Sequence, residues 1–142
     1  MSCDELREET RLYPNIRLII AGAANLLSVM LMLRLRGVGG TLLWIESNSR
    51  PFQDTANEGQ LADSVADAIA LVAALAPVRA RCLEQALALF RYLRRSGVRC
   101  QFQLGVQPYR FRAHAWVEYD GRPVREEEEN IRSLVRVPAL AV

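Results

Sequence analysis

The sequence predicts an α+β domain in which helices come first and then pack on one face of a small antiparallel sheet. Hydrophobic residues recur at helical spacing up to residue 95, and they alternate with polar residues from residue 99 onward. Two turn signals, Gln107-Pro108 and Asp120-Gly121, divide the alternating part into strands. Helices followed by a run of strands are typical of this fold class.

The length of 142 residues fits one domain with a single core. We divide that domain into a helical N-terminal portion, residues 1–78, and a core of one helix plus the sheet, residues 79–142.

The most apolar segment is residues 18–33, which hold 16 residues without a charge. This is shorter than the roughly 20 residues that a membrane-spanning helix needs, so we predict a buried helix. The alternative is a surface that docks a partner or a membrane. Gly37, Gly39 and Gly40 are expected to end the helix, and residues 41–60 are expected to form a loop.

Two further helices are predicted before the sheet. An alanine-rich pattern predicts one at residues 61–76, ended by Pro77. The other covers residues 81–95 and stops at Ser96-Gly97.

The sheet is predicted from alternation along two strands, with a third beginning near Arg122 and a short helix near Asn130. The apolar positions are Cys100, Phe102, Leu104, Val106, Ala113, Ala115, Val117 and Tyr119. This pattern places Cys100 in the core.

Composition excludes several classes of function. The net charge is only +2, and all 18 basic residues are arginines spread along the chain without a basic stripe, so we do not expect nucleic-acid binding. Three cysteines without a CxxC pair predict neither a disulfide framework nor a cysteine-based zinc site. One histidine excludes a multi-histidine metal site. Four acids within the first nine residues do not fit a secretory signal, so we expect a cytoplasmic protein with free thiols.

Cys82 is the first candidate for chemistry. It opens the helix predicted at 81–95, with Arg79 and Arg81 just before it. A helix N-terminus and nearby cations stabilise a thiolate, which is the nucleophilic form of cysteine. Buried, inert cysteine is nevertheless common, so position alone does not establish catalysis.

His114 is the candidate general base. It lies in a strand, on the face opposite Ala113, Ala115 and Val117. A lone histidine is more often structural. A cysteine at a helix start followed by a histidine on a strand is, however, an arrangement that thiol catalysis needs.

The third member of a triad would orient the imidazole, and the acidic run at residues 126–129 supplies candidates. A strict two-residue Asp120-Gly121 turn places Glu127 opposite His114, whereas a loop one residue longer brings Glu126 to the histidine face. The sequence does not choose between them. Glu118 shares the histidine face, but four residues along one strand put it roughly 13 Å away.

Three segments together resemble the lasso-peptide leader peptidases, which are transglutaminase-like, papain-related cysteine peptidases. The segments are RCLEQALALFRYLRRSGV, CQFQLGV and FRAHAWVEYDGRPVREE, and the likeness covers residues 79–129. Cysteine and histidine are 32 residues apart, and the histidine and Glu126 are 12 apart, as in that family. The resemblance implies Cys82 as nucleophile, His114 as base and Glu126 as orienting acid, although the family usually has aspartate in the last position.

The resemblance also implies partners and a reaction. Residues 12–76 look like the helical part of the stand-alone form of this peptidase, which acts with a separate small leader-binding protein. The expected reaction is removal of the leader from a ribosomally made precursor peptide, without a cofactor. A separate ATP-dependent lasso cyclase would close the core peptide, since this chain has no phosphate-binding GxxxxGK[ST] loop.

Several points stay open at the level of sequence. Backbone N–H groups near Cys82 are expected to stabilise the oxyanion, with Gln85 and Gln103 as possible side-chain donors. The same residues would also suit a transglutaminase-like acyl transferase that passes the acyl group to an amine. A non-catalytic peptide-docking module, with Cys82 as a core residue, is the third alternative.

Overall fold

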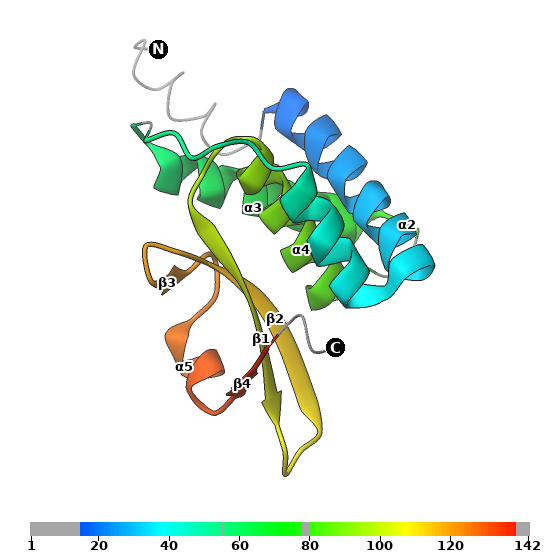
Figure 1. The fold of residues 1–142 in the computed structure, drawn as a ribbon, viewed down its shortest axis with the longest axis vertical. Helices are drawn as coiled ribbons and strands as arrows, with labels where there is room; N and C mark the ends of the chain where they lie inside the picture. The colour runs from blue at the N-terminus through cyan, green and yellow to red at the C-terminus, as the bar shows by residue number, and fades with distance from the viewer. Residues whose placement is uncertain (1–14, 55, 78–79, 139–142) are drawn as a thin grey trace, which may run out of the picture.

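The computed structural model describes residues 15–54, 56–77 and 80–138, and it confirms the predicted α+β class (Figure 1). Long helices precede the sheet, and a short helix interrupts it near the C-terminus. The elements are α2 (Ile16–Ser47), α3 (Glu58–Leu75), α4 (Cys82–Arg95), β1 (Cys100–Gln107), β2 (Arg112–Tyr119), β3 (Arg122–Pro123), α5 (Glu128–Arg132) and β4 (Val135–Val137). The division at residue 78 stays a prediction.

The sheet is antiparallel, with strand order β3-β2-β1-β4. Its two faces have different neighbours. Ala115 and Val117 pack into the main core with α2, α3 and α4, as the alternation predicts. Trp116, on the other face, packs against Ile131 and Leu134 from the segment that contains α5. Thus β2 has helices on one face and the C-terminal segment on the other.

Helix α4 lies at the centre of the fold, between the sheet and the other long helices (Figure 1). Leu87, Ala88 and Leu93 have no solvent-accessible surface. The helix stops where predicted, because Gly97 has a φ of 79°, which only glycine adopts without strain. A Cβ there would also lie 2.9 Å from the carbonyl oxygen of Pro51. The central position of α4 holds its N-terminal residue, Cys82, in a fixed place.

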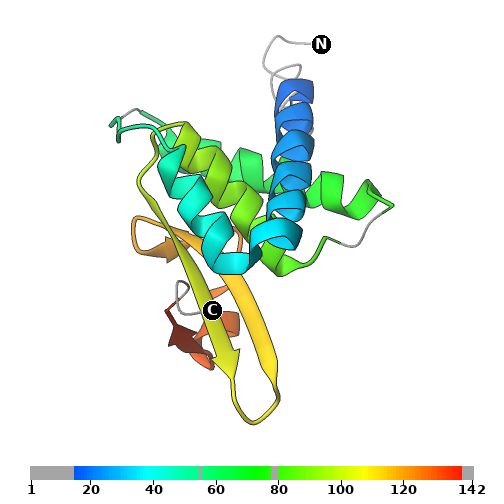
Figure 2. The same cartoon turned by 45° about the vertical axis from the view of Figure 1, so that its right-hand side comes forward.

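Helix α2 differs from the prediction, because residues 41–47 are helical and not part of a loop. Gly37 breaks the helix with φ 68° and ψ −172°, and residues 38–47 then run back from the kink at an angle to the first part (Figures 1 and 2). The Thr41 hydroxyl donates to the Gly37 carbonyl oxygen at 2.6 Å, which links the kink to the first turn of the second segment. Burial of Leu42 and Ile45 in the core stabilises a second helical segment that the glycines alone disfavour.

The first part of α2 is less buried than predicted. Gly22, Leu26 and Val29 face the fold, whereas an apolar stripe on the other side is 58–69% exposed and consists of Ile16, Ile20, Leu27, Leu31 and Leu35. By length and composition α2 is apolar enough to cross a membrane, with 22% of its most apolar window buried. Core helices of soluble proteins share that composition. The stripe is the largest departure from the predicted buried helix.

A buried polar contact fixes α2 to α4. The Asn25 side chain donates to the Ala21 carbonyl oxygen at 2.7 Å and accepts a hydrogen bond from the Arg91 guanidinium. Arg91 also lies over the Trp44 ring, 4.8 Å from its centroid, and burial followed by the charge of Arg95 lowers its pKa. These hydrogen bonds satisfy the polar side chain of Asn25 within the apolar segment.

The Asp120-Gly121 turn is the predicted tight hairpin. Both residues have positive φ, 52° and 74°, and Tyr119 pairs directly with Arg122. This is a two-residue turn whose twist matches the strands. The third strand does begin at Arg122, but it ends one residue later at Pro123.

Candidate active site

Cys82 is the first residue of α4 and is partly exposed. Arg81 before it is extended, and its backbone N–H donates to Glu84 Oε2 at 3.0 Å. The Gln85 amide reaches back to the Ala80 carbonyl oxygen at 2.9 Å. These contacts fix the chain that leads into the helix, so the thiol lies at a well-defined, electropositive helix end.

His114 contacts Glu126. The imidazole Nε2 lies 2.7 Å from Glu126 Oε2, and both side chains are largely buried. In the neutral tautomer that donates from Nε2 to this carboxylate, Nδ1 has no proton and can act as a base. The other carboxylate oxygen of Glu126 accepts a hydrogen bond from the Asn130 side chain at 3.0 Å. Between the two acids left open by the sequence, Glu126 is the one that contacts the histidine.

Glu126, and not Glu127, contacts His114 because of the backbone conformation of Arg125, which neither predicted register took into account. The turn is the strict two-residue form, which by strand parity would favour Glu127. The ladder ends after Pro123, however, and Arg125 has a φ of 53°, so the alternation of sides is broken before the acidic run begins. Arg125 is held by Asp67 on α3 at 2.6 Å, with Asp63 at 3.9 Å. The left-handed conformation of Arg125 directs the Glu126 side chain to His114.

Cys82, His114 and Glu126 line one pocket of about 260 Å³. The pocket lies at the edge of β2, where α3 and α4 meet the segment 124–126. Apolar side chains complete its wall, among them Ala66, Ile69, Ala70, Ala86 and Leu89. The fold therefore brings the three predicted residues to one opening, while their catalytic roles stay a prediction.

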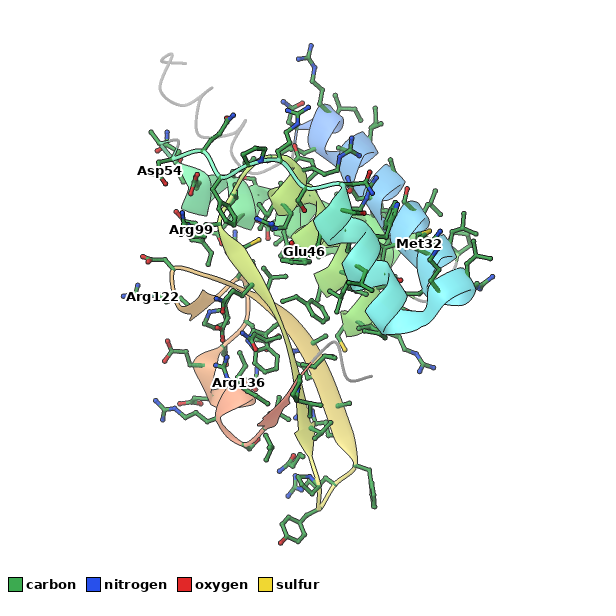
Figure 3. All side chains as sticks on the ribbon, viewed as in Figure 1. Met32, Glu46, Asp54, Arg99, Arg122 and Arg136 are labelled. Atoms are coloured by element: carbon green, nitrogen blue, oxygen red, sulfur yellow. The ribbon has the colours of Figure 1, made fainter. Side chains whose placement is uncertain are left out.

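Trp116 supports the imidazole from the same strand face. Its ring stacks on His114, with centroids 6.1 Å apart and planes inclined by 18°. The indole N–H donates to Glu118 Oε1 at 3.1 Å. Arg136, which is labelled in Figure 3, binds that carboxylate at 2.8 Å and lies over the indole. Glu118 is thus bound to Trp116 and Arg136 and not to the histidine, in line with its expected separation.

Gly105 makes room for this arrangement. It pairs with His114 across β1 and β2, and a Cβ there would lie 2.8 Å from the Leu134 Cβ and 3.0 Å from the Trp116 ring. The indole therefore packs over a strand position that has no side chain.

We expect Gly105→Ala to lower the free energy of unfolding by about 1–3 kcal/mol, because the methyl group overlaps buried neighbours that cannot move freely. Chemical denaturation monitored by tryptophan fluorescence measures the change. Gly121→Ala is an informative comparison: it has open space around its Cβ, so its cost comes from its positive φ alone. An unchanged midpoint for Gly105→Ala would contradict the close packing.

The two glutamines differ in position. Gln85 lines the pocket, whereas Gln103 lies next to Gln101, with 3.4 Å between their side-chain amides, and is not part of the pocket wall. The N–H of Cys82 belongs to the first turn of α4 and has no acceptor within the helix. The candidate oxyanion donors are therefore the Cys82 N–H and the Gln85 amide.

Cys100 lies in the core, as predicted. Burial raises the pKa of its thiol to about 12, with a smaller opposing effect from Arg94. Both described cysteines are free thiols. Among the described residues, no three His, Cys, Asp or Glu side chains gather as metal ligands would.

We expect iodoacetamide at pH 8 to modify Cys82 and to leave Cys100 unmodified while the protein is folded. A pKa raised to about 12 leaves very little Cys100 thiolate at that pH, and the residue is largely buried. Peptide mapping by mass spectrometry reads both sites. Cys100 should react after unfolding in urea, and equal rates in the folded protein would disprove the distinction.

We expect Glu126→Ala to lower kcat roughly 100-fold or more, because the imidazole loses the group that sets its tautomer and orientation. Glu127→Ala is the matched control: it removes the neighbouring acid, which does not contact His114 among the described contacts, and should stay within about threefold of the parent. Steady-state cleavage kinetics compare the two. Equal losses would mean that the contact with Glu126 has no catalytic role.

Asn130 and Arg125 are contributors that the sequence did not single out. Asn130 follows Glu126 by four residues, a spacing that permits contact across the first turn of α5, but asparagine near a helix start has many other uses. The positive φ of Arg125 could not be predicted from the sequence, since arginine rarely adopts this conformation.

The comparison with known families agrees with this geometry. The family profile of the transglutaminase-like superfamily matches residues 25–138, which is most of the chain and includes all three candidate residues. No curated protein and no solved structure gives a significant match. The chain therefore belongs to the transglutaminase-like superfamily.

Proposed function

We propose that this protein is a cysteine endopeptidase that removes the leader from a ribosomally made lasso-precursor peptide. The observation that carries the proposal is the His114–Glu126 pair, 2.7 Å apart, on the pocket that Cys82 also lines. The superfamily includes cysteine peptidases and acyl transferases. The likeness of residues 79–129 to the leader peptidases supports leader removal as the reaction.

In this mechanism, the Cys82 thiolate attacks the carbonyl carbon at the leader–core junction, and His114 Nδ1 takes the thiol proton. Glu126 stabilises the imidazolium through Nε2. The oxyanion of the tetrahedral intermediate is held by the Cys82 N–H and the Gln85 amide. His114 then gives the proton to the leaving amine, so the core peptide departs with a free N-terminus. Water attacks the thioester, which releases the leader with a free carboxylate and restores Cys82.

The proposal includes a separate small leader-binding protein, which the resemblance to the stand-alone leader peptidases implies. The exposed stripe of α2 is the surface that we assign to this partner, since it is apolar and contributes no residue to the pocket wall. A lasso cyclase would take up the released core peptide in the cytoplasm.

The test combines the purified protein, a leader-binding partner and precursor peptides, with products identified by mass. A leader ending in a free carboxylate together with a core bearing a free amine supports the peptidase. A product in which the acyl group is joined to an added amine, at the expense of hydrolysis, would assign the protein to the acyl transferases. Binding of the precursor without any fragment, with the partner present, would identify a docking module.

A further inference from the structure

One side of α3 contributes both to the wall of the pocket and to the contacts of Arg125. Residues spaced three or four positions apart share one side of a helix. Those on this side are Asp63, Ala66, Asp67 and Ala70. The two alanines line the pocket, whereas the Arg125 guanidinium donates to Asp67 Oδ2 at 2.6 Å and its Nε lies 3.9 Å from Asp63 Oδ1. Helix α3 therefore presents both apolar and acidic side chains toward the candidate site.

The conformation of Arg125 needs support from outside its own segment. Its φ of 53° lies in the left-handed region, which arginine rarely occupies because the Cβ crowds the following carbonyl oxygen. The segment before it has little regular pairing, since β3 ends at Pro123 and one further hydrogen bond joins the Val124 N–H to the Val117 carbonyl oxygen at 2.9 Å. The contacts with α3 therefore favour a backbone conformation that this residue does not prefer by itself.

The direction of the Glu126 side chain depends on that conformation. If Arg125 were extended, strand alternation would direct Glu127 to the histidine side and Glu126 away from it. With the left-handed Arg125, the Glu126 carboxylate reaches His114 Nε2 at 2.7 Å and accepts a hydrogen bond from Asn130 at 3.0 Å. The ion pair with α3 is thus linked to the imidazole through two consecutive residues.

We propose that Asp67 is a positioning residue for the proposed peptidase. It holds Arg125 in the left-handed conformation, and this conformation keeps the Glu126 carboxylate on the imidazole. The inference rests on the proposed function and assigns α3 a part in the alignment of its triad. Asp67 is not part of the pocket wall, and it and Arg125 are about half exposed. Because such ion pairs contribute little to the free energy of unfolding, we expect the effect in the site and not in global stability.

The kinetic test uses Asp67→Asn, which keeps the shape of the side chain and removes its charge. We expect kcat for precursor cleavage to fall roughly three- to tenfold and KM to change less than about twofold, because the pocket wall stays intact. Glu46→Gln is the matched control, since Glu46 is 53% exposed and binds Arg94 at 3.0 Å outside the pocket. It should keep the parental kcat. Equal losses of kcat in the two variants, or a change in KM alone, would overturn the proposal.

Replacing Arg125 with glycine separates positioning from any other effect of the aspartate. Glycine adopts a positive φ without strain and has no side chain for α3 to bind. In the Arg125→Gly background, Asp67→Asn should therefore change kcat by less than about twofold, whatever the rate of Arg125→Gly itself. A loss of the same size in both backgrounds would mean that Asp67 acts by another route, and the proposal would fail. Thermal denaturation checks folding, and if Arg125→Gly does not fold, the histidine spectrum decides.

The imidazole gives a readout that needs no substrate. His114 is the only histidine in the chain, so nitrogen NMR of isotope-labelled protein without a histidine tag reports on this ring alone. At a pH where the ring is neutral, we expect the tautomer that donates from Nε2 to Glu126 to dominate in the parent. In Asp67→Asn the share protonated at Nδ1 should rise, whereas Glu46→Gln should match the parent. An unchanged ring in Asp67→Asn would overturn the proposal.

The two readouts separate this proposal from the proposed function. If the parent protein does not cleave the precursor, the peptidase assignment fails, but a ring that responds to Asp67→Asn and not to Glu46→Gln would still establish the positioning contact. If the parent cleaves the precursor, and neither kcat nor the ring responds to Asp67→Asn, only the positioning role is wrong.

Discussion

Replacing Cys82 with alanine is expected to abolish cleavage of the precursor, lowering kcat by roughly 10⁴-fold or more. The thiol is the only nucleophilic sulfur on the pocket among the described residues, and the alanine side chain cannot form the thioester. Because Cys82 is partly exposed at a helix end, its loss should hardly change the free energy of unfolding. Mass spectrometry of precursor digests under single-turnover conditions measures the residual rate.

Cys100→Ala is the control for this experiment. It removes a thiol that β1 contributes to the core and should cost some stability, but it should leave kcat near that of the parent at a temperature where the variant is folded. Normal processing by Cys82→Ala would exclude the catalytic role of the thiol. Loss of activity in both variants alike would indicate a structural effect and not a chemical one.

Replacing His114 with alanine is expected to lower kcat by about 10³-fold or more, since proton transfer to and from the reacting groups then depends on water. Substrate binding should change less, because the apolar wall of the pocket remains. The truncated side chain leaves space beside Glu126, so added imidazole should restore part of the rate. Initial rates with and without imidazole measure both effects.

Arg112→Ala is the matched control for His114→Ala. Arg112 lies on the same strand and the same face, two residues earlier, and is exposed outside the pocket. It should cleave within about threefold of the parent and should not respond to imidazole. A His114→Ala variant with the parental rate would require another base, and the mechanism proposed above would be wrong.

The spacing of apolar residues and the turn residues correctly predicted much of the regular secondary structure. The helix beginning at Cys82, the two long strands and the Asp120-Gly121 turn are where the spacing of apolar residues and the turn chemistry placed them. In these elements, local preference and burial agree.

The departures arise where one residue's backbone conformation decides the outcome. The three glycines after residue 36 indicated a helix end, but Leu42 and Ile45 gain enough from burial to rebuild a helix after the kink. Strand parity predicts which acid faces His114 only while β3 stays paired with β2, and this pairing ends at Pro123. Arg125 then changed the side on which the next residue lies, and tertiary contacts with Asp67 and Asp63 hold it there.

The site could be predicted only as far as its sequence spacing is characteristic. Cys82 and His114 were identified because a cysteine at a helix start and a histidine on a strand have a chemical rationale. Other features of the site depend on tertiary contacts. They are the stacking of Trp116 on His114, the absence of a side chain at Gly105 beneath the indole, and the hydrogen bond from Asn130 to Glu126. Such contacts leave no periodic trace in one sequence.

The apolar stripe on α2 has a thermodynamic consequence. Any molecule that covers Ile20, Leu27 and Leu31 binds the folded chain in preference to the unfolded one. By linkage it raises the free energy of unfolding with the logarithm of its concentration, by about 2.7 kcal/mol at one hundred times its Kd. The melting temperature of the isolated chain is therefore a lower bound on the stability of the domain with that surface covered.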